Sequence, residues 1–230
     1  MKGTDPRRAI IGDALAIGIG TGAYGISFGA LAVASGLSVW QTQALSLLMF
    51  TGASQFALIA VIASGGSALV AISTATLIGT RNTFYSVAMA PILRVRGLRR
   101  LLAAQWTIDE STGMAVGHED RRDAARLAFW STAIAIYVLW NLGTLLGAVG
   151  AGFIEDPNMF GLDAAAPAAF LALIWPRLTS WPMRWVAIVS LGTAVVLAPF
   201  LSAGLPVLLA GAAGIAVGLV LGARAPEVER

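Results

Sequence analysis

The stretch LIGTRNTFYSVAMAP, residues 77–91, places Arg81 in the middle of an otherwise apolar run that extends from Ala68 to Leu93. In a membrane, an unpaired arginine at mid-depth costs about 2.5–3.5 kcal/mol on insertion scales. Arg81 is also about 13 residues, or about 20 Å, from either end of a straight helix, too far to reach an interface. We therefore predict that it faces a cavity or a partner. The alternative is a buried ion pair, with Asp13 or Asp109, that only fixes helix packing.

Composition shows that the run belongs to a membrane protein. The chain has 230 residues, of which 57% are hydrophobic and 12% charged, against about 25% charged in ordinary soluble domains. Its mean hydropathy is +0.80. Seven stretches approach the ~20 apolar residues that cross a bilayer: 10–35, 40–63, 68–93, 127–152, 160–176, 185–202 and 205–222. The sequence predicts an all-α integral membrane protein with one transport domain, residues 1–230, and about six to seven transmembrane helices.

Several other classes of protein are disfavoured by the same composition. The chain has no cysteine and a single histidine, His118, so thiolate and histidine metal sites are unsupported and we expect no cofactor. The pI near 9.9 reflects basic residues that flank apolar runs, which favours membrane topology over a nucleic-acid partner. The basic start and the apolar run after it also resemble a secretory signal peptide. That run is longer than the usual ~7–15 residues and carries Asp13, which favours a membrane helix.

Positive charge predicts the orientation in the membrane. Basic residues gather in the interval 94–126, which we expect in the cytoplasm together with the C-terminus, whereas the acidic connection 153–159 is expected outside. Lys2, Arg7 and Arg8 also favour the cytoplasm, although three apolar runs separate them from 94–126. If all three runs crossed the membrane, the N-terminal segment and the interval 94–126 would lie on opposite sides. Either the N-terminus is outside, or one run is broken or re-entrant.

Polar, glycine-containing segments interrupt the first three runs. They are GTGAYG at 20–25, FTGASQF at 50–56 and GTRN at 79–82. Non-helical backbone at membrane depth survives where protein or a water cavity covers it, as in transporters with discontinuous helices. We predict broken or re-entrant helices in this half. Helix packing is the alternative, and we favour it for two stripes of glycine, at residues 18, 22, 25 and 29 and at residues 211, 214, 218 and 222.

Six segments, taken together and in this order, resemble the AzlC family, the large subunits of bacterial branched-chain amino acid exporters. They are FGALAVASGLS (28–38), FTGASQFA (50–57), TRNTFYSVAMAP (80–91), DES (109–111), WNLGTLLGA (140–148) and GLDAAAPAAFLAL (161–173). The resemblance implies a bacterial inner-membrane protein that exports valine, leucine, isoleucine or similar apolar amino acids with a small AzlD-type membrane subunit. One departure is visible: the family usually has asparagine two places before the arginine, where this chain has Gly79.

The chemistry of a zwitterionic amino acid can be matched to polar residues of the chain. Its carboxylate requires a guanidinium or the N–H groups of a helix N-terminus. Its ammonium requires a carboxylate, and its aliphatic side chain requires an apolar pocket. Candidate substrate-binding residues are Arg81, Asn82, Ser54, Gln55, Gly52 and Tyr85. Candidate acids for the ammonium or for a coupling proton are Asp109, Glu110, Asp13 and Asp163. Each acid has a simpler explanation: Asp13 as a helix N-terminal charge, Asp109 and Glu110 as solvated loop charges, and Asp163 as a cap.

Two alternatives to a transporter remain open from the sequence. An embedded enzyme is disfavoured because no HExxH, GxSxG or histidine pair is present. A non-transporting membrane partner or assembly subunit would explain the polar segments by subunit contacts alone. No phosphate-binding loop of the type GxxxxGK[ST] is present, so we expect proton coupling rather than ATP as the driving force. A weak match of 28–38 to 170–180 suggests an internal repeat.

Overall fold

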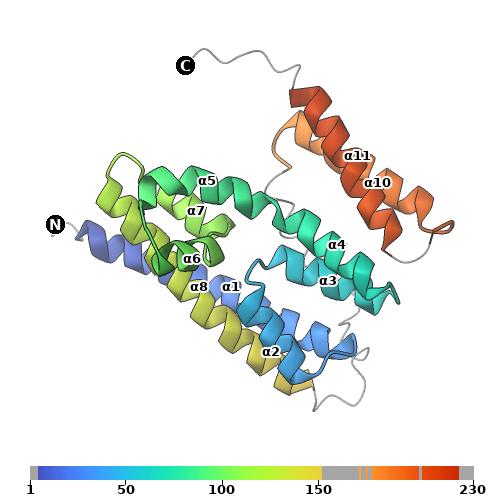
Figure 1. Cartoon of the computed structure of the whole chain (residues 1–230), viewed down its shortest axis with the longest axis horizontal. Helices are drawn as coiled ribbons and strands as arrows, with labels where there is room; N and C mark the ends of the chain where they lie inside the picture. The colour runs from blue at the N-terminus through green and yellow to red at the C-terminus, as the bar shows by residue number, and fades with distance from the viewer. Residues whose placement is uncertain (1–4, 152–170, 172–174, 176–177, 202–203, 223–230) are drawn as a thin grey trace.

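The computed structural model of the chain describes residues 5–151, 171, 175, 178–201 and 204–222. Every regular element among these residues is a helix, as the all-α prediction required (Figure 1). The N-terminal helices are α1 (Pro6–Ala34), α2 (Val39–Leu48), α3 (Ala53–Ala63), α4 (Ala68–Gly79) and α5 (Arg81–Leu93). They are followed by α6 (Leu98–Gln105), α7 (Asp109–Val116), α8 (Arg122–Ala151), α10 (Trp181–Leu197) and α11 (Leu205–Gly222).

Helices α1 and α8 form the scaffold and run parallel. The first glycine stripe belongs to α1 and packs against α8. A Cβ at Gly18 would lie 3.0 Å from the Cβ of Ala135, and one at Gly22 would lie 3.0 Å from the Cβ of Leu139. Gly29 lies against the carbonyl of Thr144. Residue numbers rise together along this contact, so the two helices point the same way. Small residues let the backbones approach, which confirms packing as the role of this stripe.

The expected break at 20–25 is wrong. Helix α1 is continuous over 29 residues, and its glycines serve the contact with α8 instead of interrupting the helix. Glycine weakens a helix by about 1 kcal/mol relative to alanine, a cost that close packing on α8 offsets.

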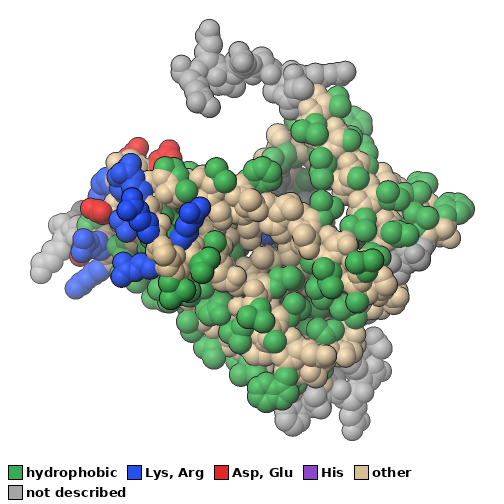
Figure 2. Space-filling model, in the orientation of Figure 1, with side chains coloured by type: hydrophobic (Ala, Val, Ile, Leu, Met, Phe, Trp, Pro, Cys, Tyr) green, Lys and Arg blue, Asp and Glu red, His purple; other side chains and the backbone are tan. Residues whose placement is uncertain are grey.

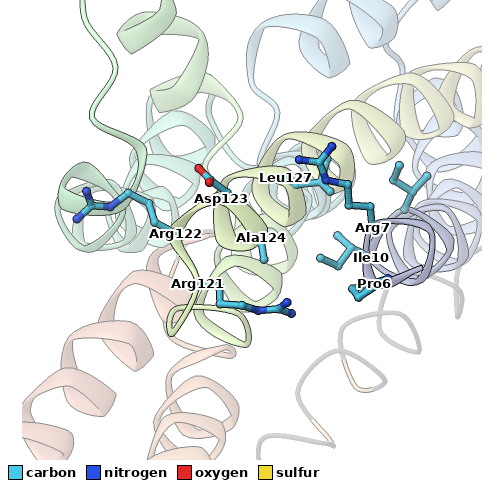
Figure 3. A pocket seen from close by; sticks show the side chains of 9 residues that line it. Pro6, Arg7, Ile10, Arg121, Arg122, Asp123, Ala124 and Leu127 are labelled. Carbon is cyan, nitrogen blue, oxygen red and sulfur yellow. The ribbon is translucent and has the colours of Figure 1, made fainter. Parts of the chain in front are cut away.

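The start of α1 and the start of α8 lie at the same end of the molecule. Arg7 of α1 and Arg121 and Arg122 before and at the start of α8 line one pocket (Figure 3). Figure 2 shows the arginine side chains gathered at this end. We call it the basic end, and the end where Ala34 and Ala151 terminate α1 and α8 the opposite end. The two basic regions of the sequence therefore share one side, and the chain between them must return.

Helices α2 and α3 make the first helix–break–helix unit. The predicted break at 50–56 is confirmed: α2 ends at Leu48, and Gly52, with φ +54°, precedes α3. Only glycine adopts such a backbone without strain. Two hydrogen-bonded pairs fix α2 on α8, namely Gln43 with Asn141 and Ser46 with Thr144. In Figure 1 the unit starts and ends at the opposite end of the molecule. The run 40–63 is therefore a broken pair of helices that turns back on itself.

Helices α4 and α5 return the chain to the basic end (Figure 1). The predicted break at GTRN is present but is confined to Thr80, which stands between the two helices and itself has helical dihedral angles, φ −56° and ψ −27°. Arg81 is thus the first residue of α5. The helix ends at Leu93, and the next residue, Arg94, has left-handed backbone with φ 48°.

The interval 94–126, predicted as a polar connection, instead contains the second helix–break–helix unit. Helix α6 enters from the basic end, and α7 returns to it after a break at residues 106–108 (Figure 1). Met89 and Leu93 of α5, Ala103, Ala115 and Phe129 form one buried cluster here. A second cluster, nearer the opposite end, contains Phe28, Phe50, Phe56, Ile59 and Trp140, among others. This second cluster also includes Ile108, from the break between α6 and α7, so the apolar cores of the two units meet at the breaks.

Helices α10 and α11 pack on each other at the C-terminal side. A Cβ at Gly214 would collide with the hydroxyl of Ser190, and one at Gly218 would lie 3.8 Å from Val186. These contacts confirm packing for this part of the second stripe. Among the described residues, α1 and α8 are long and apolar enough to cross a membrane, and α3, α10 and α11 are shorter apolar helices. The connection 153–159, Asp163, most of the segment 170–180 and the C-terminus lie outside the described residues.

Candidate functional site

A cavity of about 310 Å³ lies where the breaks of the two units meet α5. Helices α1, α3, α4, α5, α7 and α8 and the two breaks supply its lining. The lining residues are Thr21, Tyr24, Phe50, Thr51, Gly52, Ala53, Phe56, Ile78, Arg81, Ile108, Asp109, Glu110, Ile136 and Trp140. Its volume falls at the lower end of the ~300–1,000 Å³ of ligand pockets. A small molecule is therefore the kind of ligand that it fits.

The charged residues of the cavity come from two different helix starts. The Nη1 atom of Arg81 is 3.4 Å from Oδ2 of Asp109, and the two side chains are 28% and 16% exposed. The Nη2 atom of Arg81 also donates a long hydrogen bond, 3.4 Å, to the carbonyl of Thr51. Among the described residues, the Nε atom of Arg81 has no hydrogen-bond partner. The pair is thus partly exposed, and one buried donor of the guanidinium, Nε, is left without a partner among the described residues.

Most of the remaining wall is apolar and aromatic. Phe56 and Trp140 meet edge to face with ring centroids 6.2 Å apart, and Trp140 also stacks on Phe28 at 6.0 Å. Phe50 packs on Tyr137 at 5.0 Å. Ile78, Ile108 and Ile136 complete the lining between them. Aromatic contacts on both sides hold these rings in place, so this wall presents a fixed apolar surface.

Three helices, α3, α5 and α7, begin at the cavity, and the first turns of α3 and α7 differ in charge. Helix α7 begins with Asp109 and Glu110, whereas α3 has no acid in its first turn. A helix N-terminus carries about +0.5 of an elementary charge, which acids neutralise at α7 but not at α3. The cavity is therefore more positive beside Gly52 and Ala53 and more negative beside Asp109 and Glu110.

The candidate substrate residues fall into two groups. Arg81 and Gly52 line the cavity, and the Cβ that Gly52 lacks would lie 3.9 Å from the Trp140 ring. Gln55 is 0% exposed, and both ends of its amide are engaged. Its Oε1 accepts from the Gly52 N–H at 3.1 Å, and its Nε2 donates to the Leu45 carbonyl at 3.3 Å. It therefore shapes the break and does not face the cavity.

Ser54, Asn82 and Tyr85 lie outside the lining. Ser54 is 1% exposed, and its hydroxyl has no hydrogen-bond partner among the described residues. A Cβ added at Gly79 would lie 3.4 Å from that hydroxyl. Asn82 and Tyr85 are half-buried further along α5. They contribute to the surroundings of Arg81 rather than to the wall of the cavity.

The four candidate acids are also separated by the fold. Asp109 and Glu110 line the cavity at the start of α7, so their explanation as solvated loop charges is wrong. Asp13 is exposed on α1 beyond its first turn, so it does not have the proposed N-terminal charge role, and Arg81 forms its ion pair with Asp109 instead. Asp163 lies outside the described residues.

Sequence reasoning missed the apolar and aromatic part of the lining. Tyr24, Ile78, Ile136 and Trp140 belong to runs in which most residues are apolar, and nothing in their spacing separates a cavity wall from a lipid-facing or packing position. Of the apolar lining residues, Phe50 alone could have been identified from the sequence, because it belongs to the segment that breaks at Gly52.

Comparison with known proteins assigns the chain to a family. The sequence profile described as AzlC protein matches residues 16–154, which include α1 from residue 16 onward, α2 to α8 and the whole cavity lining. The chain belongs to the AzlC family. The resemblance drawn from the six sequence segments is thereby confirmed. No solved structure matches this AzlC-family chain.

Three relatives from distant organisms carry membrane-protein names. An "Uncharacterized membrane protein" of Archaeoglobus fulgidus is 35% identical over 161 residues, 69% of each chain. The "Inner membrane protein YgaZ" of Escherichia coli is 28% identical over 173 residues, 70% of this chain and 69% of the relative. An "Uncharacterized membrane protein" of Helicobacter pylori is 25% identical over 170 residues, which are 72% of this chain and 74% of the relative. Together with the apolar composition, these names support a membrane protein.

Proposed function

We propose that this AzlC-family protein is the large subunit of a secondary exporter for branched-chain or similar apolar amino acids in the bacterial inner membrane. The Arg81–Asp109 pair in the wall of an otherwise mainly apolar cavity carries the proposal. A pair of opposite charges beside an apolar surface matches an amino acid that has a carboxylate, an ammonium and an aliphatic side chain.

In the proposed complex each part of the amino acid has its own surroundings. The carboxylate lies between Arg81 and the N-terminus of α3, where N–H groups and positive helix charge favour an anion. The ammonium lies at Asp109 and Glu110. The aliphatic side chain packs against Phe56 and Trp140. Binding then replaces part of the Arg81–Asp109 contact with two ligand contacts, so neither charge loses its partner.

The chain works, in this proposal, with a small AzlD-type membrane subunit, and a proton gradient drives efflux. Asp109 or Glu110 carries the coupling proton, because both face the cavity through which the substrate passes. The basic end faces the cytoplasm, following the concentration of arginines there. The described crossing segments are then α1, α4–α5, α8, α10 and α11, with α2–α3 and α6–α7 re-entrant.

Efflux from proteoliposomes tests the proposal. Vesicles loaded with labelled leucine are prepared with the chain alone, with the small subunit alone and with both, and efflux is followed after a proton gradient is imposed. We expect efflux only when both subunits are present. If the complex assembles but transports none of valine, leucine, isoleucine and methionine, the chain is a non-transporting partner and the proposal is wrong.

A further inference from the structure

The first seven helices repeat one order of elements. A long helix, α1, is followed by the broken pair α2–α3; a second long segment, α4–α5, is followed by the broken pair α6–α7. The first set covers residues 6–63 and the second residues 68–116. This pairing differs from the repeat suggested by 28–38 and 170–180.

The tips of the two broken pairs share a local motif. The first tip reads FTGASQ at 50–55 and the second WTIDES at 106–111, each an aromatic residue, a threonine, the helix N-cap and three helical residues. In both, the third helical residue folds back onto the N-cap. Gln55 accepts from the Gly52 N–H at 3.1 Å, and Ser111 accepts from the Ile108 N–H at 3.0 Å. The two helix starts are therefore held by the same hydrogen bond.

The two sets run in opposite directions. Helix α1 leads from the basic end to the opposite end, where α2–α3 begins, whereas α4–α5 leads back to the basic end, where α6–α7 begins (Figure 1). The bodies of the two pairs lie in different apolar clusters, since Phe56 and Ile59 of α3 pack in one and Ala103 and Ala115 of α6–α7 in the other, while Ile108 at the α6–α7 tip joins the first. Inverted repeats of this form are one of the two symmetric plans found in transporters.

The tips meet at the cavity and touch each other. The side-chain nitrogen of Gln105, at the end of α6, donates to the carbonyls of Leu47 and Leu48 at the end of α2, at 3.3 and 3.0 Å. Gly52 and Ala53 of one tip and Ile108 and Asp109 of the other line the cavity. Each tip thus stands between the cavity and one end of the molecule.

From these observations we infer that residues 6–63 and 68–116 are an inverted pair whose tips are alternating gates, with Gln55 and Ser111 as the positioning residues of the two gates. The inference rests on the proposed transport function and adds the route by which the cavity opens. Loosening the α2–α3 tip opens the cavity toward the opposite end, and loosening the α6–α7 tip opens it toward the basic end. Gln105 holds both tips in the closed arrangement.

Cysteine labelling tests the gates without measuring transport. The chain has no cysteine, so Thr21→Cys places a single thiol in the cavity lining. The full complex is labelled with a membrane-impermeant maleimide in vesicles of either orientation. Gln55→Ala is expected to raise labelling from the opposite end, and Ser111→Ala to raise labelling from the basic end, each by about fivefold or more, because each variant removes at least one hydrogen bond of its tip. Increases at the same end, or in neither variant, overturn the inference.

The chain offers a matched control for the tip hydrogen bond. Gln41, also the third residue of its helix, accepts from the Ser38 N–H at 2.8 Å, but it is exposed at the start of α2, away from the tips. Gln41→Ala should leave labelling unchanged. An increase equal to that of Gln55→Ala would show general loosening and would refute the gate.

A second variant keeps the test decisive if a tip variant fails to assemble. Gln105 is partly exposed, so Gln105→Ala removes the contact between tips without opening a core. We expect labelling to rise from both ends. Unchanged labelling in this variant contradicts the closed arrangement. If labelling follows the expected pattern but no amino acid is exported, the inference about the gates is supported and the proposed substrate is wrong.

Discussion

The guanidinium of Arg81 and the carboxylate of Asp109 lie 3.4 Å apart, although they belong to the first turns of different helices, α5 and α7. Helix starts favour acids and disfavour bases, so Asp109 suits its position and Arg81 does not. Asp109 offsets part of that cost and so holds the arginine at the cavity.

Arg81→Lys tests whether the arginine binds the carboxylate. Lysine keeps the charge but loses the planar fork that matches a carboxylate. We expect the complex to assemble and the apparent affinity for leucine to fall about tenfold or more, since a hydrogen bond to a charged group contributes about 1.5–3 kcal/mol. Equilibrium binding of labelled leucine measures this. Unchanged affinity contradicts the carboxylate role, and loss of assembly favours a packing role for the pair.

Asp109→Asn tests the ammonium site. Because the variant removes negative charge from the cavity wall, we expect leucine to bind more weakly. We also expect the preference for leucine over its deaminated carboxylic acid, which has no ammonium, to become smaller. Competition of the two compounds against labelled leucine measures the preference. Asp13→Asn is the control, because Asp13 is exposed on α1. An unaltered preference in Asp109→Asn would assign the ammonium elsewhere.

Gly79→Asn restores the residue usual in the family and should stabilise the protein. A Cβ at this position makes ordinary contact with the Ser54 hydroxyl, 3.4 Å away, and the added amide can hydrogen-bond that buried group. The gain is about 1 kcal/mol, the net value of one hydrogen bond. Thermal unfolding in detergent should show a higher Tm than wild type. Gly79→Ala, which adds the Cβ without the amide, separates the two contributions.

Gly29→Ala should destabilise the scaffold. Its Cβ would collide with the Thr144 carbonyl, so α1 and α8 must separate, at a cost of about 1–3 kcal/mol. Gly20→Ala is the control on the same helix, because nothing lies within 4 Å of its Cβ. We expect a lower Tm for the first variant and an unchanged or higher Tm for the second. Equal effects would exclude close packing as the cause.

The proposed orientation is open to a labelling test. Leu98 is 72% exposed at the start of α6, near the basic end. In Leu98→Cys we expect an impermeant thiol reagent to react from the cytoplasmic side alone. Reaction from outside the cell would invert the topology and place the opposite end in the cytoplasm.

The sequence predicted those parts of the fold that depend on local chemistry. The break at Gly52 followed from a polar, glycine-containing segment, and the packing of Gly18 and Gly29 followed from their helical spacing. The same reasoning failed for residues 20–25, because a glycine that breaks a helix and one that permits close packing look alike until the partner helix is known. Helices α6 and α7 were missed because each has only 8 residues and arginines dominate the preceding segment.

The candidate site was predicted where it carries charge. Arg81 was identified because a charged side chain within an apolar run requires a cavity or a partner. Asp109 lies in the polar interval 94–126 and was identified through the resemblance of DES to the AzlC family and as one of two possible partners of Arg81. Gln55 was also identified, but nothing in the sequence shows that both ends of its amide bind backbone. The aromatic wall depends on which faces of α1, α3 and α8 converge, and that information exists only in the assembled structure.

The parallel pairing of α1 with α8 also sets the order in which the protein can be assembled during synthesis. Gly29 meets Thr144 only after every helix between them has been made. At about 5–20 residues per second, the ribosome needs on the order of ten seconds to cover that distance. Through this interval the glycine face of α1 lacks its final neighbour, whereas α10 and α11 can pair as soon as both emerge. A nascent chain stopped before α8 therefore exposes the most closely packed surface of the native protein.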